Sequence, residues 1–305
     1  MTHQFRGILA LLVVTLVWGT TFPAMKSLTA YFSPIWIVFL RFILASVLML
    51  PFLRGARLKD CRTGAAVGVV LFFCYVFQVE GLALTTSNRN AFITGLNVLV
   101  VPLLGYFAGK KPERRIVIAL ALALVGLFAL CSEGGAASWS RGDTLALLAA
   151  FAFGLYVKMM EGATRKVDNL MTLTAMQIVT VALCSALWLL AREIPRTQID
   201  VSSDMLNYWT YIGNGVRLYA VNFLYLGVLC TAGIIALQTW GQSHSTANEA
   251  AVIYAFEPAA AAFFAYFWLG ELMTWQAWIG AALLIAGMIV SQWNTERPAT
   301  ALVPE

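Results

Sequence analysis

The sequence predicts an all-α integral membrane protein with ten transmembrane helices arranged in two inverted five-helix repeats. Composition is the first reason, because the 305 residues are 60% hydrophobic and only 11% charged, unlike a soluble globular chain. The second is that the apolar residues form runs of roughly 20 residues, the length that crosses a bilayer. The third is that part of the first half of the chain aligns with part of the second half.

Ten expected spans follow one another along the chain, five in each half. The spans of the first half are residues 8–27, 34–53, 64–84, 90–108 and 115–132, and those of the second half are 143–160, 170–190, 218–240, 248–269 and 275–292. Most connections between them are short. Residues 191–217 collect charges, Asn and Gly, so we expect a long loop outside the membrane there. Alternatively, the stretch YWTYIGNGV within it lies at the headgroup level, which Trp and Tyr favour.

Lysines and arginines between the spans indicate the orientation, because basic residues near span ends stay on the cytoplasmic side. Thirteen lie in the two tails and in the connections after spans two, four and six, whereas six lie in the opposite connections. We therefore expect a multi-pass protein of the inner (plasma) membrane with both termini in the cytoplasm. This asymmetry accounts for the net charge of +5, so no nucleic-acid partner is expected. A cleaved signal peptide at the first span is an alternative, although no small-x-small cleavage site follows it.

Cysteine and histidine usage indicates neither an enzyme nor a metal centre. The five cysteines are at least 13 residues apart and form no C-x-x-C motif. His3 and His244 alone cannot build a metal site, and the sequence has no H-E-x-x-H, P-loop or G-x-S-x-G motif. We therefore expect no catalytic residue, no metal and no cofactor.

The internal repeat relates residues that are 161 positions apart. Three pairs illustrate the offset: Gly109 with Gly270, Gly126 with Gly287, and Asn97 with Pro258. Because five spans is an odd number, the second copy must enter the membrane from the opposite side to the first. We place the first repeat at residues 1–137, the second at 138–295 and a cytoplasmic tail at 296–305.

Four stretches carry a resemblance to a known family. They are LVWGTTFPAMK (16–26), PIWIVFLRFILASVLMLP (34–51), LALTTSNRNAFITGLNVLVVPLLG (82–105) and AAVIYAFEPAAAAFFAYFWLGE (250–271). With a W-G motif ending span one, an Arg in span two and an E-P then L-G-E pattern in span nine, the chain resembles the EamA-type members of the drug/metabolite transporter superfamily. It departs from them at AGKKPE (108–113), where L-G-E-[RK] is commoner.

This resemblance implies a secondary transporter that moves a small metabolite by alternating access. Its cavity would lie between spans 1, 3, 4, 6, 8 and 9, and export or exchange of an amino acid or a related compound is the favoured activity. A passive channel or facilitator is the alternative activity. Nucleotide-, vitamin- or sugar-type solutes are the less favoured alternative substrates. The expected partners are the solute, the lipid bilayer and protons as a coupling ion, and a monomer and a homodimer both stay open.

Ionisable residues inside the spans are candidate functional groups, because each costs about 2.5 to 3.5 kcal/mol to insert at a helix centre. Glu257 lies near the midplane. It either binds a cationic group or a proton, or it holds its helix in place, and we favour this structural role. Arg41 is expected to pair with helix-end carbonyls or an acid rather than with a substrate carboxylate. Glu80 and Arg89 are expected to form an ion pair at the outer side, with an outer gate as the alternative. Pro258 should bend span nine without breaking it.

Polar and aromatic residues on the cavity-lining spans complete the predicted site. Pockets combine aromatic walls with a few polar groups, and we expect about half of these residues to line the cavity. The candidate substrate-binding residues are Trp18, Tyr75, Gln78, Thr94, Asn97, Tyr156, Asn222, Gln238 and Tyr254. We assign packing roles to the small residues Gly19, Gly95, Gly126, Gly287, Ala251, Ala255 and Ala259, which let membrane helices approach closely.

Overall fold

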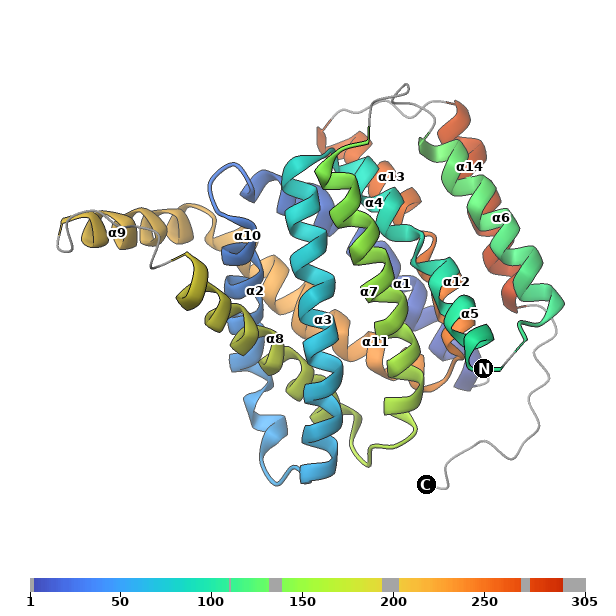
Figure 1. The fold of residues 1–305 in the computed structure, drawn as a ribbon, viewed down its shortest axis with the longest axis horizontal. Coiled ribbons are helices and arrows are strands. Elements are labelled where there is room, and N and C mark those ends of the chain that lie inside the picture. Colours follow the sequence, from blue (N-terminus) through green and yellow to red (C-terminus); the bar gives the residue numbers. More distant parts are fainter. Residues whose placement is uncertain (1–2, 110, 132–138, 194–202, 270–274, 293–305) are drawn as a thin grey trace.

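The structure, a computed structural model, describes residues 3–109, 111–131, 139–193, 203–269 and 275–292, and within these ranges every regular element is a helix (Figure 1). Seven of the expected spans are helices long and apolar enough to cross a membrane. They comprise α1 (His3–Leu28), α2 with η1 (Pro34–Met49, Leu50–Leu53), α3 (Leu58–Leu84), α4 with α5 (Ser87–Gly95, Asn97–Phe107), α7 (Arg141–Thr164), α8 (Leu170–Arg192), and α10, η4 and α11 (Ala220–Leu224, Tyr225–Gly233, Ile234–Ser243).

The remaining three expected spans also fall on helices. These are α6 (Arg114–Cys131), α12 with α13 (Ala247–Tyr254, Glu257–Leu269) and α14 (Trp275–Gln292). Polar caps explain where several helices begin. The hydroxyl of Ser140 accepts the backbone N–H of Asp143 at the start of α7, and that of Thr246 accepts the backbone N–H of Glu249 at the start of α12. Each acid completes a capping box, which satisfies the first free N–H groups of its helix.

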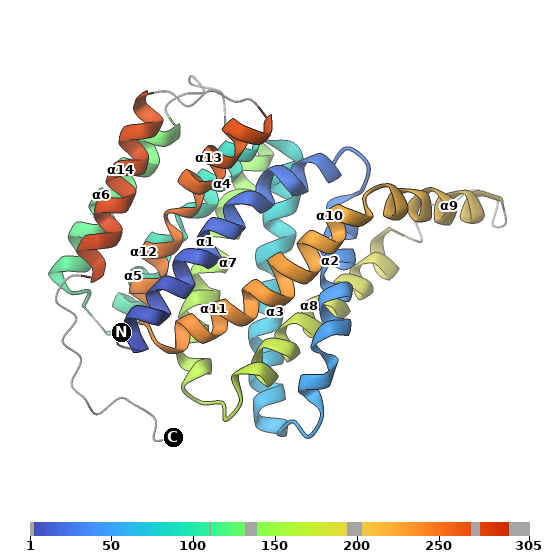
Figure 2. The ribbon, with the colours of Figure 1, turned by 180° about the vertical axis from the view of Figure 1, so that it is seen from behind.

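A long loop was expected over residues 191–217, and this expectation is wrong for residues 203–217 because α9 (Ser203–Leu218) is a helix. Residues 194–202 of the expected loop lie outside the described ranges. The helix α9 extends sideways from the bundle in both ribbon views (Figures 1 and 2). One of its aromatic residues holds it against the turn between α1 and α2. Tyr211 stacks on Tyr31 with ring centroids 4.3 Å apart, and each hydroxyl donates to the other residue's carbonyl at 3.0 Å. The many Asn and Gly residues hid this helix in the sequence, because they are typical of loops.

The helices α6 and α14 form a pair at one side of the molecule (Figure 1). A Cβ added to Gly126 would lie 2.7 Å from the carbonyl oxygen of Gly280, and one added to Gly287 would lie 2.9 Å from that of Ala119. Ala119 and Gly280 are themselves 161 positions apart, as are the two other glycines. The contact is therefore reciprocal, as expected for segments related by a two-fold axis.

Two of the membrane helices are interrupted near their middle. The first break is at Leu96, between α4 and α5, and the second is at Ala255 and Phe256, between α12 and α13. The predicted bent but continuous helix at Pro258 is therefore wrong. Proline has no N–H to offer the carbonyl four residues earlier, and the N–H of Phe256 instead bonds three residues back to Ile253 at 3.1 Å, which tightens the turn.

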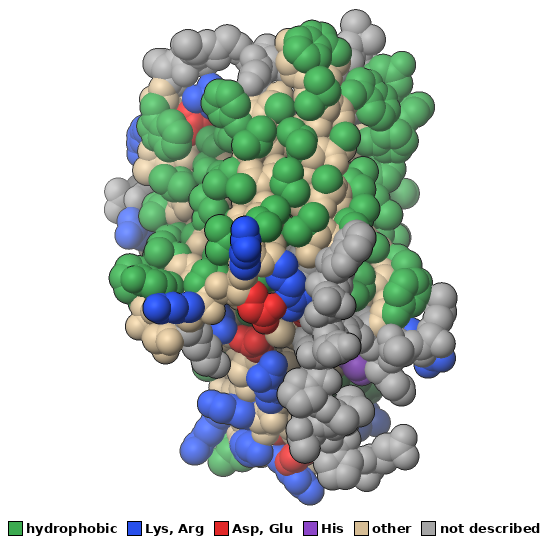
Figure 3. Space-filling model, turned by 90° about the vertical axis from the view of Figure 1, so that its right-hand side faces the viewer, with side chains coloured by type: hydrophobic (Ala, Val, Ile, Leu, Met, Phe, Trp, Pro, Cys, Tyr) green, Lys and Arg blue, Asp and Glu red, His purple; other side chains and the backbone are tan. Residues whose placement is uncertain are grey.

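On the face drawn in Figure 3, the two ends of the bundle differ in charge. Hydrophobic side chains dominate the upper part of the face in Figure 3, and most Lys and Arg side chains of that face lie below them. The start of α1, the turn between α2 and α3 and the turn between α7 and α8 lie at this basic end (Figures 1 and 2). We call it the inner end, following the orientation that the sequence predicts.

Candidate functional site

A cavity lies where α1, α3, α5, α7 and α11 meet the break between α12 and α13. Its wall is formed by Trp18, Thr21, Tyr75, Gln78, Asn97, Phe153, Val157, Gln238, Tyr254 and Glu257. The volume open to the centre of a water molecule is only about 20 Å³. Because one water needs about 10 to 15 Å³ on this measure, the free space in the cavity is much smaller than a metabolite.

Six of the nine predicted substrate-binding residues line this cavity together with Glu257. The six are Trp18, Tyr75, Gln78, Asn97, Gln238 and Tyr254. They come from five helices spread along the chain, so the fold brings together what the sequence keeps apart. Whether they contact a solute stays a prediction.

The other three predicted residues do not line the cavity. Thr94 is buried on α4, one turn before Asn97. Asn222 is half-buried on α10. Tyr156 is buried behind the cavity wall, where its hydroxyl lies 2.9 Å from Oε1 of Gln177 and 3.3 Å from Oε1 of Gln238. Tyr156 therefore contacts a cavity residue rather than the cavity.

Glu257 carries the only carboxylate of the cavity wall as the structure describes it. Its side chain is buried, and no residue in the described ranges forms a hydrogen bond or an ion pair with it. Glu257 is also the first residue of α13, so the positive end of that helix dipole lies beside the carboxylate. An isolated buried carboxyl group is available to a proton or to a cation from the cavity.

Four further polar atoms of the cavity wall lack a partner in the described part of the chain. They are Nε1 of Trp18, Oδ1 of Asn97, Nε2 of Gln238 and the hydroxyl of Tyr254. More than about 90% of buried polar groups in native proteins are hydrogen-bonded, so a group of unpaired atoms around one cavity is unusual. It indicates a site for a polar ligand or for water.

Aromatic rings surround the acid. The rings of Trp18 and Tyr254 have centroids 5.5 Å apart, and those of Tyr75 and Phe153 have centroids 5.9 Å apart. The faces of such rings attract cations. The combination of Glu257 with these rings therefore favours a positively charged group in the cavity.

Arg41 lies behind the cavity wall and differs from the expectation. Its Nε donates to Oγ1 of Thr231 at 2.9 Å, and its guanidinium carbon lies 4.8 Å from the ring centroid of Tyr75. Neither a helix-end carbonyl nor an acid among the described residues pairs with it. The cause is the π-helix η4, in which the hydroxyl of Thr231 donates to the carbonyl of Leu226 and accepts from Arg41.

The expected ion pair between Glu80 and Arg89 is not formed. Arg89 instead makes two contacts with Asp143, at 2.7 and 2.8 Å. Asp143 is fully buried and held by the capping box at the start of α7, so its carboxylate is already aimed at α4. Glu80 is half-buried on α3.

Sequence reasoning missed three residues of the cavity wall. Thr21 follows Trp18 by three positions, so both lie on the same face of the helix. This spacing could have identified Thr21 as a cavity residue. Phe153 and Val157 are four positions apart on α7 and have no polar group, so nothing in the sequence separated them from ordinary packing residues.

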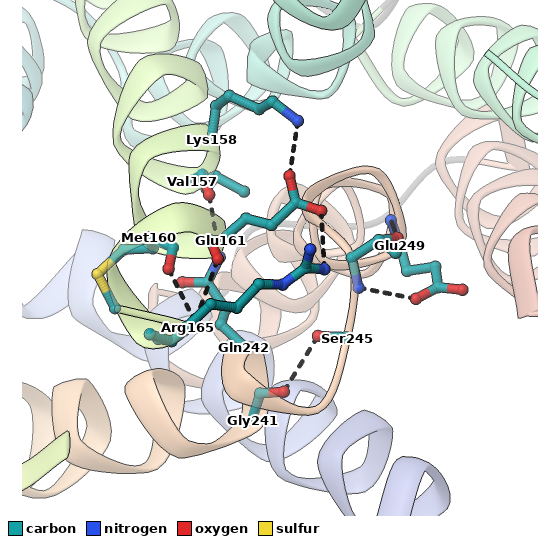
Figure 4. A network of polar contacts seen from close by, with 11 residues as sticks. Val157, Lys158, Met160, Glu161, Arg165, Gly241, Gln242, Ser245 and Glu249 are labelled. Atoms are coloured by element: carbon teal, nitrogen blue, oxygen red, sulfur yellow. Dashed lines mark hydrogen bonds and ion pairs between the residues drawn. The ribbon is translucent and has the colours of Figure 1, made fainter. Parts of the chain in front are cut away.

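A polar network lies next to the cavity at the inner end, where α7 meets α11 (Figure 4). Glu161 contacts Lys158 at 2.6 Å and Arg165 at 3.5 Å. Nε2 of Gln242 lies 3.5 Å from the carbonyl oxygen of Val157, whose side chain lines the cavity. Of these contacts, the one between Gln242 and Val157 joins α11 to α7, whereas the two of Glu161 lie within α7 and its C-terminal cap.

The sequence model of the EamA-like transporter family matches residues 5–132 and 140–292, which together make up most of the chain. The chain belongs to the EamA-like transporter family. This confirms the resemblance seen in the sequence and indicates a membrane transporter, a class that is typically not enzymatic.

Relatives of this EamA-family chain carry the same general description. It is 29% identical over 283 residues to an "Uncharacterized transporter" of Archaeoglobus fulgidus, an alignment that covers 92% of this chain and 84% of the relative. The "Uncharacterized transporter YwfM" of Bacillus subtilis is 25% identical over 194 residues, 63% of this chain and 59% of that protein. A crystal structure aligns with a TM-score of 0.69 at 18% identity, covering 94% of this chain and 97% of the other. That likeness concerns the fold alone.

Proposed function

We propose that this EamA-family protein is a secondary transporter that exports or exchanges an amino acid, or a related small metabolite with an amino group, by alternating access. The observation that carries the proposal is the buried carboxylate of Glu257, which has no hydrogen bond or ion pair to any described residue and lies in a cavity walled by aromatic rings. A carboxylate with aromatic neighbours suits an ammonium group, which combines positive charge with three hydrogen-bond donors.

The rest of an amino acid finds complementary atoms in the same wall. The unpaired Nε1 of Trp18 and Nε2 of Gln238 are donors suited to a carboxylate, and the unpaired Oδ1 of Asn97 is an acceptor for a second ammonium hydrogen. When the cavity is empty, a proton can neutralise the carboxyl group of Glu257. Binding of proton and solute in turn would couple exchange to the proton gradient.

A ten-span inverted repeat underlies this mechanism. Three features support it. First, helices occupy the three further expected spans, namely α6, α12 with α13, and α14. The second is the reciprocal contact between α6 and α14, and the third is a family match in two successive segments. When shifted by 161 positions, the break at Leu96 falls one to two residues after the break at Ala255 and Phe256. Paired broken helices at the midplane are typical of carriers with inverted repeats.

The small cavity fits one stage of such a cycle. Its volume of about 20 Å³ is too small for a metabolite, so solute entry requires helices to separate at one end. The two helix breaks offer joints for this movement, because the regular α-helical backbone is interrupted there. Rocking of the halves would then expose the site to each side of the inner membrane in turn.

A thermal-shift screen of the purified protein tests the substrate class. Amino acids should raise the melting temperature more than nucleosides, vitamins or sugars, because a ligand that binds only the folded form stabilises it. Counterflow of a labelled hit in proteoliposomes then separates a carrier from a channel, since only a carrier exchanges labelled for unlabelled solute. Flux without counterflow would identify a passive channel instead.

A further inference from the structure

An ion pair fastens the first half of each broken helix, and the two pairs lie at opposite ends of the bundle. On α4, Arg89 contacts Asp143 of α7 at 2.7 and 2.8 Å. On α12, Glu249 contacts Arg115 of α6 at 3.5 Å. The starts of α4 and α7 lie at the outer end, and the starts of α12 and α6 lie at the inner end (Figures 1 and 2).

The two pairs share the same construction. Both acids are fully buried, and each is the third residue of its helix and part of a capping box, formed by Asp143 with Ser140 and by Glu249 with Thr246. Their carboxylates are therefore held in place by their own helix starts. The arginine is the partner that can leave, since its side chain is 30% exposed at the outer pair and 19% exposed at the inner pair.

Both pairs also join the two expected repeats. The outer pair connects α4 of the first repeat to α7 of the second, and the inner pair connects α12 of the second repeat to α6 of the first. Each pair therefore spans the boundary along which the halves would have to separate. The ion pair between Arg57 and Asp168 also joins the repeats, but its side chains are 72% and 47% exposed, so it contributes little.

We propose that the ion pair of Arg89 with Asp143 holds the outer end of the transporter closed and that the ion pair of Arg115 with Glu249 holds the inner end closed. Opening to one side requires that side's pair to break while the other pair persists. This inference rests on the proposed alternating access. It makes these four residues positioning residues, because none of them lines the cavity.

The pairs are unequal in this closed conformation. The outer pair has two short contacts, whereas the inner pair has a single contact at 3.5 Å, and Arg115 also contacts Glu113 at 2.5 Å. Two charge-assisted contacts hold better than one long contact. Between the two arginine–acid contacts themselves, the outer one is therefore the stronger.

Hydrogen–deuterium exchange of the protein in lipid nanodiscs, without any solute, tests the proposal. Changing Arg89→Gln leaves the capping box of α7 intact and should speed exchange at residues 87–91 by about tenfold, as expected for the loss of a charge-assisted contact. It should also slow exchange at residues 247–251, because a population shifted toward the outward-open state keeps its inner end closed. Arg115→Gln should produce the reverse pattern.

The response of the far end is the decisive readout. Faster exchange only beside the changed residue would mean that the pairs are local structural contacts, and it would overturn the proposal. No change in exchange at either end would overturn it as well. If Arg89→Gln folds poorly, Arg89→Lys replaces it in the test. This variant keeps the charge but loses the double contact, so it should give the same pattern of exchange with smaller changes. Because no solute is present, failure of the proposed substrate class leaves this test unaffected.

Two matched variants control for charge and for neighbouring contacts. Arg141→Gln removes an exposed positive charge from the outer end without touching Asp143, and Glu113→Gln removes the second partner of Arg115 while keeping Glu249. Neither should change exchange at the opposite end. An opposite-end effect from Arg141→Gln would assign the shift to net charge and would contradict the proposal.

Discussion

The rings of Trp18 and Tyr254, 236 residues apart in the sequence, lie with their centroids 5.5 Å apart at one wall of the cavity. Trp18 belongs to α1 and Tyr254 ends α12 immediately before the helix break. The contact therefore brings an aromatic ring of the first expected repeat to the helix break of the second, next to Glu257.

Trp18→Ala should weaken binding of an amine ligand by about 0.5 to 2 kcal/mol, the contribution of a cation–π contact. Trp18→Phe should keep part of this contribution because it retains a ring. Isothermal titration calorimetry with the best hit of the thermal-shift screen measures the difference. Trp278→Ala, at a ring that is 59% exposed on α14, serves as control and should leave affinity unchanged. Equal affinities for the wild type and Trp18→Ala would show that the ring is not a ligand contact.

Glu257→Gln should abolish most binding of an amine ligand, because the amide keeps the shape of the carboxyl group but not its charge. It should also make counterflow insensitive to pH, since the amide cannot take up a proton. Counterflow in proteoliposomes between pH 6 and pH 8 measures both effects. An unchanged rate with unchanged pH dependence would assign Glu257 to a structural role and end the coupling hypothesis.

Tyr156→Phe should lower stability by about 1 to 3 kcal/mol, because it leaves the side-chain oxygens of Gln177 and Gln238 without the tyrosine hydroxyl. We expect a lower Tm in detergent and a smaller change in ligand affinity than for Trp18→Ala. Tyr266→Phe, at a residue 41% exposed, is the control and should keep the wild-type Tm. A wild-type Tm for Tyr156→Phe would mean that these contacts add nothing to stability.

Gly126→Leu and Gly287→Leu should destabilise the protein to a similar extent, by about 1 to 3 kcal/mol or more, because each side chain would collide with a backbone oxygen on the partner helix. The similarity follows from the reciprocal contact of α6 with α14. Gly162→Ala is the matched control, since an added Cβ there meets no atom within 4 Å. Thermal unfolding measures all three, and a large effect at only one of the two glycines would contradict the two-fold relation.

Lowering the pH should weaken the link between the turn before α3 and the turn before α8. The Arg57 guanidinium beside Asp168 holds the pKa of that carboxyl group below its ordinary value. Because the pKa is lower in the folded protein, the ionised carboxylate stabilises the folded state at pH values above the ordinary pKa of an aspartate. This stabilisation is lost as the pH falls through the lowered pKa. The Tm of Asp168→Asn should therefore lie slightly below that of the wild type at pH 7, and the difference should shrink as the pH falls below the ordinary pKa of an aspartate. A difference that persists at low pH would assign the effect to something other than the charge.

The helices were predictable because long apolar runs require a hydrogen-bonded backbone in lipid. The helix α9 was not, since Asn and Gly obscured its pattern, and its position depends on Tyr31, about 180 residues away. Within the cavity, the polar residues were conspicuous among apolar neighbours, whereas Phe153 was not. The partner of Arg89 could not be predicted, because Glu80 is closer in sequence while Asp143 becomes its neighbour only through packing of α4 against α7.

The contact of α6 with α14 also bears on how the chain is assembled. Gly126 and Gly287 are 161 residues apart, so during translation α6 reaches the membrane long before its partner helix has been synthesised. Its glycine face must meet lipid or the insertion machinery until then. The helices of the first expected repeat can therefore be inserted early, but this interface closes only when α14 arrives.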